Sequence, residues 1–290
     1  MSAQDLRALI EAQGVVYAPG VWDGLSARLS EQAGFGAVCA SGFAISAALG
    51  LPDAEVFTAT ENLEAVRKIR EATSLPIVAD IDTGYGNAIN AARTAASFRR
   101  AGVAAVFMED QISPKRCPIC VGDPVEVLPI GESAGKVRAV ADSLEGEVIL
   151  IARTDAVGHE ALKRAEAYVA AGADMVMPVS KTFSDLEQWR RCSEVAGVPL
   201  VAALTAWTWV ERDFTREAML EAGIAIAFLP TQLVLSAATA MRDSLRRLAA
   251  GERSEAVSAD YMKHGEFIGM IGFPEMEELQ QRYLPATVEA

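Results

Sequence analysis

The chain has 290 residues, of which 51% are hydrophobic, and a formal net charge of −13 at pH 7. This length and apolar content suit one α/β barrel domain of roughly 250 residues. The acidic charge excludes nucleic acid and anionic membranes as favoured partners. It does not exclude an anionic substrate, because a metal ion and local arginines can reverse the field inside one pocket.

The N-terminal sequence mixes charged residues into a helical pattern and lacks the apolar segment of a signal peptide. No apolar run reaches the roughly 18 residues that a membrane-spanning helix needs. We therefore expect a cytoplasmic protein without a membrane span and with reduced cysteines. Cys117 and Cys120 form a C-x-x-C pair, but no second pair or nearby histidine pair supports a zinc site.

Short apolar runs alternate with amphipathic stretches along the chain. Strands are predicted over residues 15–18, 37–40, 77–79, 104–108, 148–152, 175–179, 200–203 and 225–229. Helices are predicted over residues 22–32, 58–72, 88–100, 132–143, 159–170, 184–196, 216–221 and 232–250. Eight such units with buried, non-alternating strands predict a (β/α)8 barrel, with a doubly wound open sheet as the alternative.

Ala-Gly pairs end several predicted helices just before the next strand, with the glycines at Gly34, Gly102, Gly172, Gly197 and Gly223. Glycine just past a helix end adopts the left-handed conformation at low cost, so these pairs support the predicted register. The tail, residues 251–290, is predicted to be helical and amphipathic and to pack on a neighbouring subunit. No domain boundary is evident, and we expect residues 1–290 to form one domain.

Carboxylates recur where the predicted strands end. In chain order these positions carry Ser41 and Gly42, then Asp80 and Asp82, then Glu109 and Asp110, then Arg153 and Asp155. A barrel brings the carboxyl ends of its strands together at one face, where chemistry takes place. Neighbouring carboxylates repel each other, and a hard cation such as Mg²⁺ relieves that repulsion. The pattern therefore predicts a magnesium site rather than a zinc site or a serine triad.

The irregular segment over residues 110–130 contains four prolines and is longer than an ordinary strand-to-helix loop. It is therefore a candidate active-site loop. Two cations, Lys115 and Arg116, precede Cys117, and we expect them to lower the pKa of the thiol and make it a usable proton carrier. The alternative is a solvated basic loop in which the cysteine has no role.

In these motifs the chain resembles the isocitrate lyase and phosphoenolpyruvate mutase superfamily, in its methylisocitrate lyase and 2,3-dimethylmalate lyase branch. The matching stretches are S-G at 41–42, L-G-L-P-D ending at 53, D-I-D-T-G-Y-G-N from 80, E-D-Q from 109, K-R-C at 115–117 and I-A-R-T-D around 153. The resemblance implies a (β/α)8 barrel whose last helix is swapped between subunits, usually of a homotetramer. It also implies Mg²⁺, with Mn²⁺ as the alternative ion, acting on a small α-keto or 2-hydroxy acid.

The resemblance assigns roles to individual residues. It implies that Asp80 binds the metal directly, and that the residues binding it through water are Asp53, Asp82 and Glu109. It implies that the carboxylate and oxygen of the keto acid are held by Ser41, Gly42 and Arg153. It implies that the catalytic loop residues are Lys115, Arg116 and Cys117, with the cysteine protonating the enolate left when the carbon–carbon bond breaks.

Three departures from the lyase pattern bear on the substrate. The lyases of this family continue the loop cysteine with Gly-His, where this chain has Pro118-Ile119. They carry a glutamate after strand six and an arginine after strand eight, whereas residues 177–181 and 230–235 contain neither. The resemblance implies a lyase that cleaves a 2-hydroxy di- or tricarboxylate, of the 2,3-dimethylmalate or 2-methylisocitrate type, to an α-keto acid such as pyruvate plus a second carboxylic acid. The departures predict a pocket that is less cationic than a tricarboxylate needs, and so they favour a smaller or more apolar substrate of the 2,3-dimethylmalate type.

Other functions stay open from the sequence. One is a hydrolase, an oxaloacetate decarboxylase or a phosphonomutase on the same scaffold, and Ser180-Lys181 resembles the phosphonate branch. Another is a barrel that binds a metabolite without converting it. A third is a redox role for the Cys117 and Cys120 pair.

Overall fold

The computed structural model describes residues 2–120 and 125–284. It divides into two compact units, Met1–Leu235 and Ser236–Ala290, and each is described by itself. Among the described residues, no helix combines the length and the apolar character that a membrane span requires.

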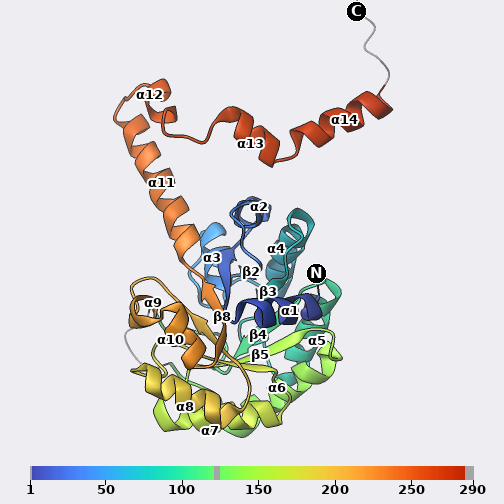
Figure 1. Ribbon diagram of the computed structural model, residues 1–290, viewed down its shortest axis with the longest axis vertical. Helices are drawn as coiled ribbons and strands as arrows, with labels where there is room; N and C mark the ends of the chain where they lie inside the picture. Colours follow the sequence, from blue (N-terminus) through green and yellow to red (C-terminus); the bar gives the residue numbers. More distant parts are fainter. Residues whose placement is uncertain (1, 121–124, 285–290) are drawn as a thin grey trace, which may run out of the picture. The chain divides into compact units, whose positions relative to one another are not determined.

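The first unit is a closed barrel of eight parallel strands in which β1 pairs with β8 (Figure 1). The strands are β1 (Val16–Val21), β2 (Val38–Ala40), β3 (Ile77–Asp80), β4 (Ala105–Glu109), β5 (Ile149–Thr154), β6 (Met175–Pro178), β7 (Leu200–Ala203) and β8 (Ile224–Leu229). Each predicted strand is present within a few residues of its expected bounds. The predicted (β/α)8 barrel is confirmed, and the open sheet is wrong.

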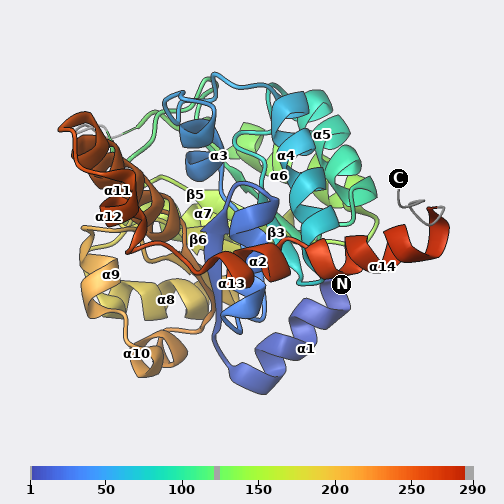
Figure 2. The same cartoon turned by 90° about the horizontal axis from the view of Figure 1, so that it is seen from above.

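Helices surround the barrel, and Figure 2 shows α4, α5 and α6 side by side on its outside. The helices of this unit are α1 (Ala3–Gln13), α2 (Gly24–Gln32), α3 (Gly42–Ala48), α4 (Ala59–Ala72), α5 (Ala88–Arg100), α6 (Ile130–Leu144), α7 (Gly158–Ala170), α8 (Leu186–Ala196), α9 (Trp209–Asp213) and α10 (Arg216–Glu221). The sequence did not predict α3 and α9, which are too short to carry a clear helical period. The five glycines of the Ala-Gly pairs all have positive φ, as expected.

Successive strand residues face two different cores. In β4, Val106 and Met108 pack with helix residues such as Phe98, whereas Phe107 belongs to the cluster inside the barrel. Phe107 and Phe228 lie with their ring centroids 5.2 Å apart. Because both faces of each strand are covered, the strands read as continuous apolar runs in the sequence.

The second unit is helical. It comprises most of α11 (Gln232–Ala249), followed by α12 (Ser254–Ser258), α13 (His264–Met270) and α14 (Phe273–Tyr283). One face of α14 carries large apolar side chains three or four residues apart, and all of them are exposed: Phe273, Met276, Leu279 and Tyr283. This spacing is that of a helix face which packs against another apolar surface.

Candidate active site

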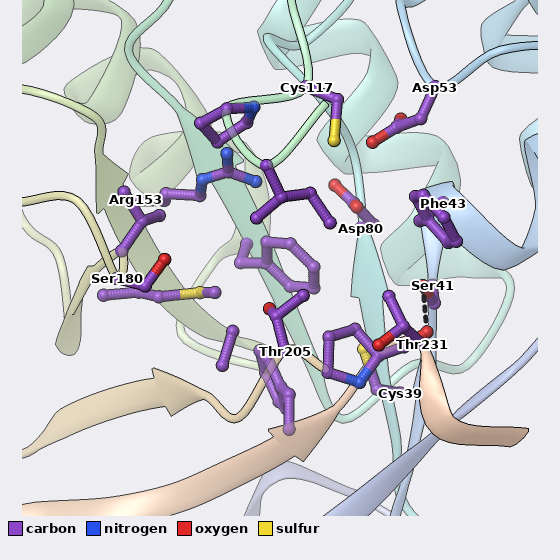
Figure 3. Close-up of a pocket in the computed structure, with 18 of the residues that line it drawn as sticks. Cys39, Ser41, Phe43, Asp53, Asp80, Cys117, Arg153, Ser180, Thr205 and Thr231 are labelled. Atoms are coloured by element: carbon purple, nitrogen blue, oxygen red, sulfur yellow. Dashed lines mark hydrogen bonds between the residues drawn. The ribbon is translucent and has the colours of Figure 1, made fainter. Parts of the chain in front are cut away.

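A cavity lies at the carboxyl ends of the strands, and each strand from β2 to β8 contributes a side chain to its wall (Figure 3). The predicted site residues that line it are Ser41, Asp53, Asp80, Lys115, Cys117 and Arg153. The apolar part of its wall includes Phe43, Phe107, Met177, Val179 and Phe228. These apolar residues were not predicted as site residues, because in the sequence they look like ordinary core positions.

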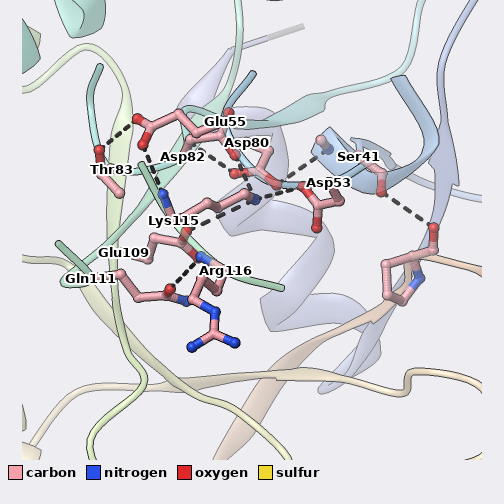
Figure 4. A network of polar contacts seen from close by, with 12 residues as sticks. Ser41, Asp53, Glu55, Asp80, Asp82, Thr83, Glu109, Gln111, Lys115 and Arg116 are labelled. Atoms are coloured by element: carbon pink, nitrogen blue, oxygen red, sulfur yellow. Dashed lines mark hydrogen bonds and ion pairs between the residues drawn. The ribbon is translucent and has the colours of Figure 1, made fainter. Parts of the chain in front are cut away.

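The Lys115 side chain lies inside a cluster of carboxylates (Figure 4). Its Nζ is 2.9 Å from Asp53 Oδ1, 2.6 Å from Asp82 Oδ1 and 3.8 Å from Glu109 Oε1. Burial acts to lower the pKa of Lys115, but the carboxylates, Asp82 first, outweigh it and raise the pKa well above its usual value. Lys115 therefore stays charged and anchors its loop to the strand ends.

Asp80 is the most enclosed carboxylate that faces the cavity. Its two oxygens accept hydrogen bonds from the backbone N–H of Gly42, at 3.2 Å, and of Asp82, at 3.0 Å. Burial, reinforced by the neighbouring Asp82 carboxylate, raises the pKa of Asp80 to about 7 despite the nearby Lys115. A Cβ at Gly42 would lie 2.7 Å from Asp80 Oδ2, so any side chain at this position would displace the Asp80 carboxylate.

Asp82 is fully buried and sits outside the cavity lining, behind Asp80. The Tyr85 hydroxyl donates to Asp82 Oδ2 at 2.6 Å, and Asn62 Nδ2 donates to the Tyr85 oxygen at 2.9 Å. Asn62 Nδ2 also donates to the Asp80 carbonyl at 2.8 Å. Sequence reasoning missed both supporting residues. Tyr85 lies within the D-I-D-T-G-Y-G-N stretch, so its place in that motif was a signal in the sequence. Asn62 lies on α4, and only the folded chain places it beside Asp80 and Tyr85.

Arg153 reaches the cavity from β5. The strand register pairs it with Glu109 of β4, and its Nη1 is 2.6 Å from Glu109 Oε2. Two further hydrogen bonds, each of 3.0 Å, fix the guanidinium on Asp155. Burial acts to lower the pKa of Arg153, but the Asp155 and Glu109 carboxylates outweigh burial and raise this pKa well above its usual value. A permanently charged, oriented guanidinium in a cavity wall suits a substrate carboxylate.

Cys117 lines the cavity beside Asp53, and only 6% of it is exposed. Burial, followed by the Asp53 charge and a hydrogen bond with Cys120, raises the pKa of the Cys117 thiol well above its ordinary value. The expected lowering of this pKa is wrong, because the Lys115 ammonium points into the carboxylate cluster instead of toward the thiol. At neutral pH the group is therefore a protonated thiol, which is the form that can donate a proton.

Arg116 is not brought to the cavity. The residue is exposed, and its backbone N–H donates to Gln111 Oε1 at 2.9 Å. Figure 4 shows its guanidinium directed away from the carboxylates. Glu109, in contrast, lies within the cluster but behind the cavity wall, where burial raises its pKa well above the usual value even beside Arg153.

The donor set suits a hard divalent cation. Asp53 Oδ1, Asp82 Oδ1 and both oxygens of Glu109 are buried, and the groups that meet them are the Lys115 ammonium and the Arg153 guanidinium. Carboxylate oxygens with surrounding water are the ligands that Mg²⁺ prefers. Over residues 2–120 and 125–284, no group of three or more acidic, histidine or cysteine side chains is placed so that it could hold a metal ion. The residues fit Mg²⁺ by the chemistry of their oxygens, while in this arrangement the Lys115 ammonium lies among those oxygens.

A model of the phosphoenolpyruvate phosphomutase family matches residues 6–249. The chain belongs to this family. Within the phosphomutase family, the chain is 41% identical over 203 residues to 2-methylisocitrate lyase of Bacillus subtilis (strain 168), a match over 69% of this chain and 66% of that enzyme. It is 34% identical over 292 residues to 2,3-dimethylmalate lyase of Eubacterium barkeri, a match over 97% of this chain and 98% of that enzyme.

A solved structure of a phosphonopyruvate hydrolase with oxalate and Mg²⁺ covers 98% of this chain and 99% of its own. Its TM-score is 0.84 and its sequence identity is 30%. The predicted superfamily is confirmed. Two of these relatives are named as lyases and one as a hydrolase.

Proposed function

We propose that this protein is an Mg²⁺-dependent carbon–carbon lyase that splits a 2-hydroxy acid into an α-keto acid and a second carboxylic acid. The observation that carries the proposal is the buried Cys117 thiol on the wall of a cavity that is also lined by Asp80 and Arg153. The named lyases among its relatives support the same reaction class.

The proposed roles follow from the positions of the side chains. Asp80 would bind the metal directly, and the residues that would hold its waters are Asp53, Asp82 and Glu109. When bound, Mg²⁺ would polarise the substrate oxygen and stabilise negative charge that develops there. Arg153 binds the substrate carboxylate, and Ser41 contributes its hydroxyl to the same wall. Cys117 donates the thiol proton to the carbon that is released as the bond breaks.

The wall of the cavity favours a substrate with a small or apolar second part. Lys115 and Arg153 are the cations on the described wall, and both are already paired with carboxylates. The remaining polar groups near the apolar wall are hydroxyls, from Ser180, Thr205 and Thr231. A tricarboxylate would bring one more carboxylate into this cavity than a dicarboxylate does, the described wall has no unpaired cation to meet it, and an unpaired buried charge is costly. We therefore propose a substrate of the 2,3-dimethylmalate type.

A substrate panel tests this proposal. Purified protein is incubated with Mg²⁺ and 2,3-dimethylmalate, 2-methylisocitrate, isocitrate, oxaloacetate or phosphonopyruvate, and release of pyruvate or another keto acid is measured. We expect kcat/KM for 2,3-dimethylmalate to exceed that for isocitrate by on the order of 10²-fold, the effect of one unpaired buried charge. A chelator should abolish the activity, and added Mg²⁺ should restore it. Turnover of phosphonopyruvate or oxaloacetate alone would contradict the lyase assignment.

We further propose that the C-terminal helices pack on a second copy of the chain in a homo-oligomer, in line with the expected homotetramer. The exposed apolar face of α14 supports this, because such a face is covered in a stable protein. We expect the double variant Phe273→Asp, Leu279→Asp to run as a smaller species in light scattering after gel filtration. The variant Gln281→Asp on the same helix adds a charge at an exposed polar position and should leave the mass unchanged. A wild-type monomer at micromolar concentration would overturn the proposal.

A further inference from the structure

Glu55 lies at the junction of three segments that surround the cavity. Its Oε1 accepts a hydrogen bond of 2.6 Å from the Thr83 hydroxyl, in the turn after β3. Its Oε2 accepts one of 2.8 Å from the Ser113 hydroxyl and one of 3.1 Å from the Lys115 backbone N–H, both in the loop after β4 (Figure 4). One carboxylate therefore ties the loop of Cys117 to the strand turn that carries the site's aspartates.

The backbone of Glu55 is held in an unfavourable conformation. Its φ is +51°, a left-handed value that residues other than glycine adopt at a cost. In the described ranges this conformation recurs at Asp82 and Tyr85, which belong to the same site, and at two residues elsewhere. Such strain persists only where the surroundings fix it, and it concentrates at functional sites. At Glu55 the three hydrogen bonds of the carboxylate are the contacts that hold this backbone conformation.

We propose that Glu55 is a positioning residue that latches residues 113–117 to the strand turn and so holds the Cys117 thiol in the cavity wall. The inference rests on the proposed function in one respect, since it takes Cys117 to be the proton donor. Lys115 is held at both ends: its Nζ lies among the carboxylates, and its backbone N–H is bound by Glu55. With both ends fixed, the chain that leads to Cys117 has little freedom.

Loss of the latch has a defined physical consequence. Without the carboxylate, the partly buried N–H of Lys115 and the hydroxyl of the fully buried Thr83 lose their acceptor. Such donors recover hydrogen bonds by turning to water, which displaces the loop outward. The buried Cys117 thiol would then become accessible, whereas Cys120 in the same loop is exposed already.

The test measures loop position without any turnover. The full chain is treated with iodoacetamide, and alkylation of Cys117 and Cys120 is followed by peptide mass spectrometry, with Cys120 as the internal standard. In Glu55→Ala we expect the Cys117 rate, relative to Cys120, to rise by on the order of tenfold, as expected when a charge-assisted hydrogen bond is lost. Glu55→Gln retains an acceptor for the loop and should recover most of the protection. Glu64→Ala removes the same kind of side chain from an exposed position on α4 and should match wild type.

Unchanged protection of Cys117 in a folded Glu55→Ala protein would overturn the proposal. If that variant does not fold, Ser113→Ala removes only the loop-side hydroxyl and should still raise the Cys117 rate, and no rise would count against the latch. In the lyase assay, Glu55→Ala should lower kcat more than it raises KM, because Arg153 and Asp80 stay in place. If wild type cleaves no substrate of the panel while the Cys117 alkylation rate still rises in Glu55→Ala, the latch stands and the proposed function is refuted instead.

Discussion

Replacing Cys117 with serine should lower kcat for carbon–carbon cleavage by about 10²- to 10⁴-fold, the usual contribution of a positioned general acid. The serine hydroxyl is nearly isosteric but is a far weaker acid than a thiol, so the proton that must reach the released carbon is no longer supplied. KM should change little, because substrate is bound by Arg153 and the metal rather than by the thiol. The measurement is steady-state keto acid release at saturating Mg²⁺.

Cys120→Ser is the matched control, since it makes the same chemical change three residues away at an exposed position. It should retain wild-type activity in reducing buffer. Equal loss of activity in both variants would instead favour a paired redox role for Cys117 and Cys120. Full activity of Cys117→Ser would contradict the lyase mechanism and favour the hydrolase, decarboxylase or phosphonate chemistry of related scaffolds.

The barrel was predictable because its determinants are local. Strands buried on both faces appear as short apolar runs, and the glycine after each of five helices marks where the chain turns into the next strand. The strand-end carboxylates were predictable for a related reason. Once the strands are parallel and closed, Asp80, Glu109 and Arg153 must meet at one face, and the register sets Glu109 beside Arg153.

What the sequence could not provide is the direction of side chains in irregular segments. Lys115 and Arg116 are adjacent to Cys117 in the chain, and adjacency alone suggested that they act on the thiol. In the structure Lys115 turns into the carboxylates and Arg116 turns outward, so the charge that Cys117 experiences most is that of Asp53. The supporting roles of Asn62 and Glu55 depend likewise on contacts between distant segments.

These contacts leave more buried carboxylates than buried cations in the site. Five carboxylates, those of Asp53, Asp80, Asp82, Glu109 and Asp155, surround two buried cations, Lys115 and Arg153. Burial raises the pKa values of Asp80 and Glu109, and neighbouring carboxylates raise them further. Lys115 and Arg153 act to lower both pKa values but do not cancel this rise. A divalent cation would offset most of this charge if it bound on the side of the cluster that faces the cavity, where Asp80 lies.

Asp80→Asn should therefore remove the dependence on Mg²⁺ together with the activity. We expect Mg²⁺ affinity in calorimetry to fall at least about 100-fold and kcat/KM by about 10³-fold or more, because the variant loses the charge that would bind the ion directly. Its thermal stability without metal should not fall, since the substitution removes a carboxylate whose charged form is disfavoured by burial and by the neighbouring carboxylates.

The effect of Mg²⁺ on stability gives a second readout. The free energy of unfolding of wild type should rise by about 2.7 kcal/mol at an Mg²⁺ concentration of 100 Kd, and that of Asp80→Asn should rise by almost nothing. Asp142→Asn, an exposed change on α6, should behave as wild type in every measurement. Undiminished Mg²⁺ affinity in Asp80→Asn would mean that the ion binds elsewhere, and the role proposed for the strand-end carboxylates would have to be abandoned.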